Sequence, residues 1–147
     1  MILKLEKSET QNDIEIIIKY PQENKTVKRL VTLFNSVDMQ INCHSDDELV
    51  IVNASDVWYI ESIDKKTIIF CEKGNYLVKD KLYQIYEKLK SVGFVRISKY
   101  CILNINKLEK VKTLENSHIE AILSNGSKLY ITRKYLPDIK QALQENL

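Results

Sequence analysis

Residues 93–104 read GFVRISKYCILN, and this stretch decides the expected fold. Alternating side chains predict a β-strand over Phe94–Ile97, and the apolar run Cys101–Leu103 predicts a second strand. The polar residues 98–100 form a short basic turn between the two strands. Gly93 follows an amphipathic stretch, at a position where the end of a helix favours a left-handed residue. The stretch therefore predicts the end of a helix and then a hairpin with a basic turn.

Short strands dominate the sequence on both sides of this hairpin. Turn signals separate them, and Asn125-Gly126 is a strong two-residue hairpin signal. Amphipathic helices are expected over Lys81–Lys90 and about Leu136–Leu143. The other expected strands are Leu49–Val52, Val57–Glu61, Thr67–Cys71, Tyr76–Val78, Leu108–Leu114, Ile119–Leu123 and Lys128–Thr132. The expected fold is mainly β with helices, α+β overall.

The N-terminal part has a different pattern. The Ile-rich stretch Ile14–Tyr20 predicts a strand, and Thr26 is expected to cap a helix whose apolar stripe runs from Val27 to Phe34. Residues 1–47 are therefore expected to be a β-α extension, too small to be a domain of its own. Such a unit would pack on the rest of the chain or on a second copy. Residues 48–147 are expected to form the main domain.

The composition excludes several classes of protein. Of the 147 residues, 44% are hydrophobic and 29% are charged, which is typical of a globular chain. No apolar run is long enough for a signal peptide or a membrane span, so a cytoplasmic location is expected.

The cysteines Cys43, Cys71 and Cys101 match no metal-binding spacing; reduced thiols are the simplest account, with redox sensing as the alternative.

Catalysis is not expected. The only histidines are His44 and His118, neither of which has a carboxylate partner at a fixed spacing, and there is no glycine-rich phosphate loop. We therefore expect no enzyme, no cofactor, no metal site and no small-molecule substrate.

Charge is distributed unevenly along the chain. The net charge is +2, but residues 1–55 carry −3 and residues 56–147 carry +5. The sign change indicates that a polyanion would meet the C-terminal part.

Three stretches, in this order, resemble the LytTR DNA-binding domain. They are VWYIES at residues 57–62, the stretch at residues 93–104, and LSNG at residues 123–126 followed by ITRKY at residues 131–135. The resemblance covers about residues 48–144. It implies an elongated β fold with small stacked sheets, in which loops rather than a recognition helix enter two successive major grooves of double-stranded DNA.

The resemblance also assigns candidate DNA-binding residues in three segments. The turn after the first stretch supplies Lys65, Lys66 and Thr67. The segment after Arg96-Ile97 supplies Ser98, Lys99 and Tyr100. The end of the last strand supplies Arg133 and Lys134. Arg133 is the best single candidate, because a guanidinium can bond both O6 and N7 of guanine. The lysines are candidates for phosphates, and Lys99 also for a guanine edge.

Some of these assignments stay open. Some relatives carry His and Asn where Thr67 and Lys99 align. The base identities that those relatives recognise therefore cannot be assigned to Thr67 and Lys99. Arg96 either contacts phosphate or pairs with an acid such as Glu61, and Trp58 is expected in the core. Only about 48 residues precede the main domain, too few for a phosphorylated receiver domain. The chain therefore resembles the stand-alone regulators of the family, and activation by aspartyl phosphorylation is not expected.

Two functions from different classes remain. The first is a bacterial transcription regulator that binds promoter DNA, with two copies on adjacent direct repeats and so a homodimer at least on DNA. The second is a protein-interaction module that couples to a partner such as a membrane sensor. If the cations of the three segments cluster on one face, DNA is favoured; if acids intersperse them, the interaction module gains.

Overall fold

The computed structural model describes residues 1–146, with side chains up to residue 143, so Leu147 of the predicted main domain lies outside the described residues. The α-helices are α1 (Lys25–Val37), α2 (Leu82–Leu89) and α3 (Leu136–Asn146). The strands are β1 (Gln40–Ser45), β2 (Glu48–Asn53), β3 (Val57–Ile63), β4 (Lys66–Cys71), β5 (Gly74–Val78), β6 (Phe94–Ser98), β7 (Cys101–Asn104), β8 (Leu108–Thr113), β9 (Ile119–Leu123) and β10 (Lys128–Ile131). Short 3-10 turns include η2 (Lys90–Val92) and η4 (Arg133–Tyr135).

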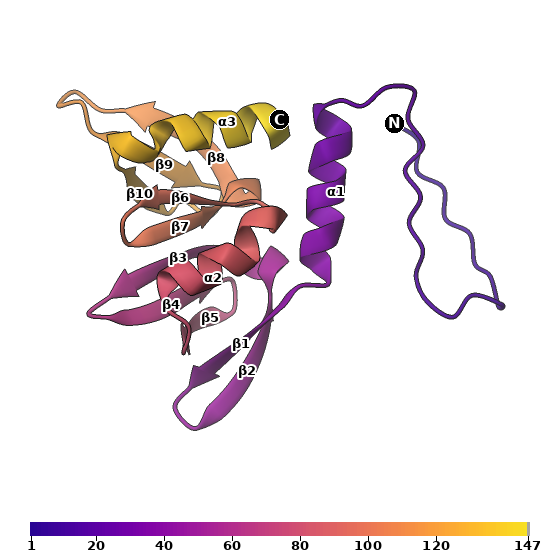
Figure 1. The fold of residues 1–147 in the computed structure, drawn as a ribbon, viewed down its shortest axis with the longest axis horizontal. Helices are drawn as coiled ribbons and strands as arrows, with labels where there is room; N and C mark the ends of the chain where they lie inside the picture. Colours follow the sequence, from indigo (N-terminus) through magenta and orange to yellow (C-terminus); the bar gives the residue numbers. More distant parts are fainter. Residues whose placement is uncertain (147) are drawn as a thin grey trace.

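The described strands form two antiparallel sheets. The seven-stranded sheet has the order β2-β1-β5-β4-β3-β7-β6, and the three-stranded sheet has the order β10-β9-β8. Figure 1 shows them one above the other, with α2 and α3 on one side and α1 beside the stack. The predicted mainly β fold with helices is confirmed.

The hairpin of β6 and β7 lies between two hydrophobic cores. Phe94 and Ile102 face the core beneath α2, while Ile97 and Leu103 face the core beneath α3 and the three-stranded sheet. All four residues of β7 are buried. A strand covered on both faces has no position for a polar face, which explains the unbroken apolar run in the sequence.

A buried amide fixes the end of this hairpin. Asn104 is 2% exposed; its Nδ2 donates to the carbonyl of Val57 at 2.9 Å, and its Oδ1 accepts from the amide of Asn106 at 3.1 Å. Both polar atoms of the amide are therefore satisfied, which removes most of the cost of burying it.

The structure differs from the sequence-based expectations in the N-terminal part. Residues 14–20 form no strand, so the predicted β-α extension has a helix but not its strand. Helix α1 is capped by Asn24, whose Oδ1 accepts from the amide of Val27 at 3.0 Å, and Thr26 lies inside the first turn. Strand β1 was not predicted, because its polar residues obscured the alternation that buries Ile41 and Cys43. The β1–β2 hairpin crosses the proposed boundary between residues 47 and 48.

Helix α1 contacts α3 and the turn η2, so it is attached to the domain along one side. No helix among the described residues is long and apolar enough to span a membrane.

Gly93 lies close to this attachment. Its φ is +96°, and a Cβ there would lie 3.1 Å from Nδ2 of Asn106 and 3.2 Å from Cγ2 of Thr32 on α1. We predict that Gly93→Ala lowers the free energy of unfolding by more than the ~1–2 kcal/mol expected for a left-handed residue alone. Gly126→Ala is the matched control, since Gly126 has φ +86° and open space around it. Equal losses for the two variants in urea denaturation would contradict the crowding.

Candidate nucleic-acid interface

The β3–β4 turn and the β6–β7 turn lie side by side. Asp64 and Lys65 both have positive φ values, +50° and +64°, which forms the tight two-residue turn between β3 and β4. Strand β3 pairs with β7 next to it. At the end of this pairing, the amide of Ser62 donates to the carbonyl of Tyr100 at 2.8 Å. The bond joins the two turns through the backbone.

The third predicted segment lies at the same end of the molecule. The amide of Thr132 donates to the carbonyl of Ile97 at 2.8 Å, which ties the end of β10 to the end of β6. Arg133 and Lys134 follow directly, in η4. Figure 1 shows the β3–β4 turn, the β6–β7 turn and the start of α3 along one end of the stack. We call the residues of this end the basic edge: Lys65, Lys66, Ser98, Lys99, Tyr100, Arg133 and Lys134.

Arg96 organises the β6–β7 turn. Its Nε donates to the carbonyl of Ser98 at 3.3 Å, and its Nη2 donates to the carbonyl of Lys99 at 2.9 Å. The amide of Tyr100 in turn donates to Oγ of Ser98 at 3.3 Å. Of the two roles left open for Arg96, pairing with Glu61 is not observed. The guanidinium instead holds the backbone of the turn, a role that the sequence did not reveal.

Exposure separates the candidate residues. The cationic side chains of the basic edge are exposed, Tyr100 is 56% exposed and Ser98 is half-buried. Thr67 is only 5% exposed, because alternation along β4 turns it inward with Ile69. Its proposed contact with DNA is therefore withdrawn, since the side chain cannot reach a ligand without a change in the sheet.

The cations of the basic edge carry uncompensated charge. Within the described part of the chain, the ion pairs are Lys88 with Asp80 and Lys90 with Glu87, and neither involves the basic edge. Three acids lie close in sequence: Asp64, in the β3–β4 turn, Glu61, which is half-buried, and Asp138, which is exposed in the first turn of α3. Burial raises the pKa of Glu61. The five cations of the basic edge outnumber these acids, so the edge carries a net positive charge.

Arg133 connects the basic edge to the loop between β8 and β9. Its Nη2 donates to the carbonyl of Ser117 at 3.2 Å, and the remaining N–H groups of the exposed guanidinium stay available. The ring of His118 in this loop meets that of Tyr130 edge-to-face, with 6.1 Å between centroids. The loop is a neighbour of the site that the sequence analysis did not include, because neither composition nor spacing set it apart.

Two aromatic contacts involve the lysines. Nζ of Lys99 lies 5.5 Å from the ring centroid of Tyr100, and Nζ of Lys134 lies 5.5 Å from that of Tyr135. Such exposed contacts are weak, so they orient the lysines while each ammonium group keeps its positive charge. Trp58 is 8% exposed and belongs to the core beneath α3, as predicted.

The three cysteines are free thiols. Burial raises the pKa of Cys43 to about 11 and raises that of Cys101 as well, which disfavours the reactive thiolate. Sγ of Cys71 donates to the carbonyl of Gly74 at 3.0 Å. None of the three belongs to the basic edge.

Comparison with known families identifies the domain. The family profile described as LytTr DNA-binding domain matches residues 47–144, which include every residue of the basic edge. The chain belongs to the LytTR DNA-binding domain family. The resemblance stated from the sequence is confirmed, and the family is one of DNA-binding domains rather than a class of enzymes.

Individual relatives agree with this assignment. A solved LytTr DNA-binding domain, of a putative methyl-accepting/DNA response regulator from Bacillus cereus, superposes with a TM-score of 0.66 at 23% identity, covering 71% of this chain and 95% of that one. An uncharacterized HTH-type transcriptional regulator of Staphylococcus aureus (strain NCTC 8325) is 30% identical, covering 92% of each chain. The sensory transduction protein LytT of Bacillus cereus is 24% identical over 89% of this chain, which spans only 55% of that protein.

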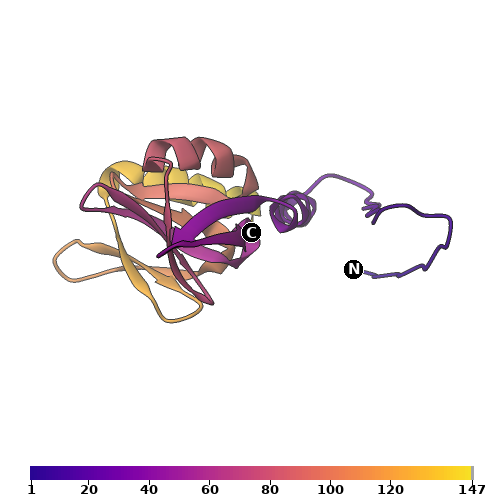
Figure 2. The same ribbon diagram turned by 90° about the horizontal axis from the view of Figure 1, so that it is seen from below.

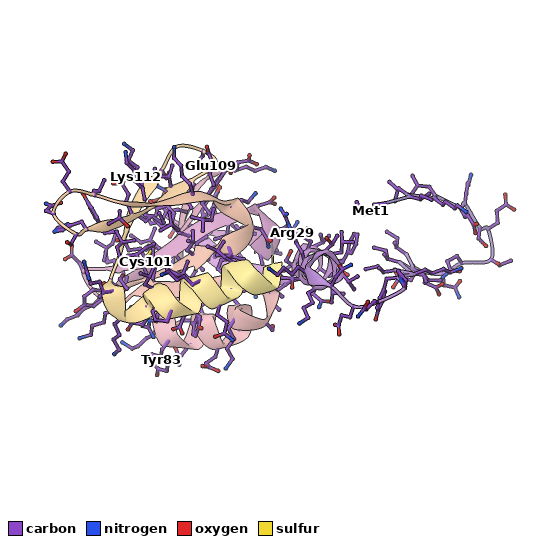
Figure 3. All side chains as sticks on the ribbon, turned by 90° about the horizontal axis from the view of Figure 1, so that it is seen from above. Met1, Arg29, Tyr83, Cys101, Glu109 and Lys112 are labelled. Carbon is purple, nitrogen blue, oxygen red and sulfur yellow. The ribbon has the colours of Figure 1, made fainter. Side chains whose placement is uncertain are left out.

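The position of Arg96 leads to a test that needs no DNA. We predict that Arg96→Ala speeds hydrogen exchange at the amides of Ser62 and Tyr100 by about tenfold, because a charge-assisted bond to a carbonyl contributes ~1.5–3 kcal/mol. Arg29→Ala is the matched control, since Arg29 is an exposed residue on α1, away from these turns (Figure 3). Unchanged exchange in Arg96→Ala would show that the turn does not depend on the guanidinium.

Proposed function

We propose that this chain is a bacterial transcription regulator that binds double-stranded promoter DNA through the basic edge. The observation that carries the proposal is the joining of three separate turns at one end by the bonds Ser62–Tyr100 and Thr132–Ile97. Among the described residues, the exposed cations of those turns form no ion pair with an acid. Membership of a DNA-binding family and the transcriptional-regulator relative support the same conclusion.

Loops rather than a helix are the proposed reading elements. In the part of the chain that the structure describes, no two α-helices follow each other without an intervening strand, so a helix-turn-helix is absent from it. The basic edge instead consists of hairpin tips and a strand end, which are narrow enough to enter a major groove. The family resemblance favours two successive grooves, with the separate turns of the edge divided between them.

The side chains suggest a division of roles. Arg133 is the proposed base-reading residue, because its planar fork matches the two acceptors of a guanine edge. Lys65, Lys66, Lys99 and Lys134 are proposed to contact phosphates and fix the register. Oγ of Ser98 accepts from the amide of Tyr100, which leaves its O–H free to donate to a phosphate. Direct-repeat half-sites with one copy on each, and a cytoplasmic location with the promoter DNA, complete the proposal.

The interaction-module alternative depends on acids placed among the cations. Asp64, within the turn that carries Lys65, and Asp138, in the first turn of α3, are such acids, but the five cations outnumber them. The charge balance therefore favours a polyanion over a protein partner at this edge, and a membrane-protein partner would have to use another surface.

Salt dependence tests the phosphate contacts. Four lysine–phosphate contacts predict a slope of about −4 in a plot of the logarithm of the binding constant against that of salt concentration. We predict that Lys65→Ala reduces the magnitude of the slope by about 1, while Lys28→Ala, on α1, leaves it unchanged. Fluorescence polarisation with promoter duplexes measures both. Binding that does not weaken with salt would contradict the proposal.

Base reading is tested at Arg133. We predict that Arg133→Ala costs ~1–3 kcal/mol on the preferred sequence and relaxes the preference at one base pair, because a bidentate contact is lost. Selection of duplexes from a random library measures the preference for the wild type, for Arg133→Ala and for the matched control Arg29→Ala. The same preferred sequence for all three proteins would remove Arg133 from base reading.

A further inference from the structure

An arm of residues 1–24 extends from the domain beyond α1. Figures 1 and 2 show it in two views at right angles, on the far side of α1 from the basic edge in both, and Figure 3 labels Met1 in it. Within this arm, residues 14–20 have neither turn nor strand pairing. The arm is therefore an extended segment whose backbone groups lack strand partners among the described residues.

The arm and α1 carry most of the exposed large apolar side chains among the described residues. Ile14 is 87% exposed, Ile16 54%, Ile17 67% and Tyr20 50%. On α1, the stripe of Val31, Phe34 and Val37 is also exposed, whereas Val27 is buried. A surface of this kind on a folded chain indicates an interaction site rather than a solvated face.

The sequence of the arm alternates as a strand with one apolar face. Ile14, Ile16, Ile18 and Tyr20 fall on one side, and Glu15, Ile17 and Lys19 fall on the other. Ile16, Ile18 and Tyr20 line the same hollow as Val27 and Val31 of α1. Ile18 is half-buried there, whereas Ile14, Ile16 and Tyr20 stay at least half exposed. Glu15, Ile17 and Lys19 are exposed on the other side, and the edge of the strand is unpaired among the described residues.

We propose that residues 14–20 pair antiparallel with the same residues of a second copy, centred on Ile17, to form a dimer in the absence of DNA. In this register Glu15 lies opposite Lys19 of the second copy, and Lys19 opposite its Glu15. Ile16 lies opposite Ile18, and the two Ile17 side chains meet at the two-fold axis. Both charge pairs are therefore favourable and both apolar pairs are matched. The pairing requires the sequence of the arm on both strands, which favours a second copy over an unrelated partner.

The dimer goes beyond the proposed DNA binding and does not depend on it. It is a state of the protein without DNA, whereas copies on direct repeats are related by translation and not by this two-fold axis. The arm contains no residue of the basic edge and extends in the opposite direction, so both surfaces are accessible at once. Two strands alone are marginally stable, but the exposed faces of the two α1 helices supply further apolar surface beside the ribbon.

A charge reversal tests the register. Light scattering across a concentration series into the high micromolar range should give twice the chain mass of 17.2 kDa for the wild type. Glu15→Lys places two lysines opposite each other twice, and should raise the dimer dissociation constant by about tenfold or more. The double variant Glu15→Lys/Lys19→Glu restores both pairs and should recover the dimer. Both positions are exposed in the monomer, so folding is not at risk.

A second pair of variants tests the axis. Ile17→Asp brings two carboxylates together at the centre and should give a monomer, whereas Leu49→Asp, at an equally exposed apolar position on β2, should leave the dimer intact. The proposal is overturned by a monomeric wild type, by equal effects of the single and double charge variants, or by loss of the dimer in Leu49→Asp alone. Ile17→Asp should still bind a single half-site duplex, which separates this test from that of DNA binding.

Discussion

The β6–β7 hairpin is the constraint on which the rest of the structure depends. Its strands are covered on both faces, by α2 and its core on one side and by α3 with the three-stranded sheet on the other. Because it is held from both sides, its turn has a fixed position, and the turns on either side are bonded to it: Ser62 donates to Tyr100, and Thr132 donates to Ile97. Separate parts of the chain are thus assembled into one basic edge by backbone bonds rather than by side-chain pairing.

In this arrangement the proposed DNA-binding surface consists of hairpin tips and a strand end, and the described residues contain no helix-turn-helix. A recognition helix carries its own geometry, whereas hairpin tips need a rigid support to keep their side chains in register. Here the support is the buried hairpin, Arg96 fixes the backbone of the central turn, and the lysines remain free of ion pairs within the described residues. Positioning and charge are therefore supplied by different residues.

Much of the main domain could be predicted from sequence, because strands covered on one or both faces leave a strong apolar pattern. The stretch at residues 93–104, the Asp64–Lys65 turn and the end of the last strand were found in this way. Predictions failed where local pattern and tertiary environment disagree. From sequence, Thr67 is placed in a polar turn, but alternation on β4 buries it. Residues 14–20 have the pattern of a strand, although the described residues contain no strand that pairs with them. The role of Arg96 depends on carbonyl positions, which no sequence pattern encodes.

The central claim is that DNA meets this protein at the basic edge. Amide chemical-shift mapping of the full chain, titrated with a duplex selected for binding, tests it most directly. The account predicts the largest shifts at residues 64–66, 98–100 and 132–134, with little change on the outer face of α2. Largest shifts on α2 or β2, with the three turns unaffected, would contradict it.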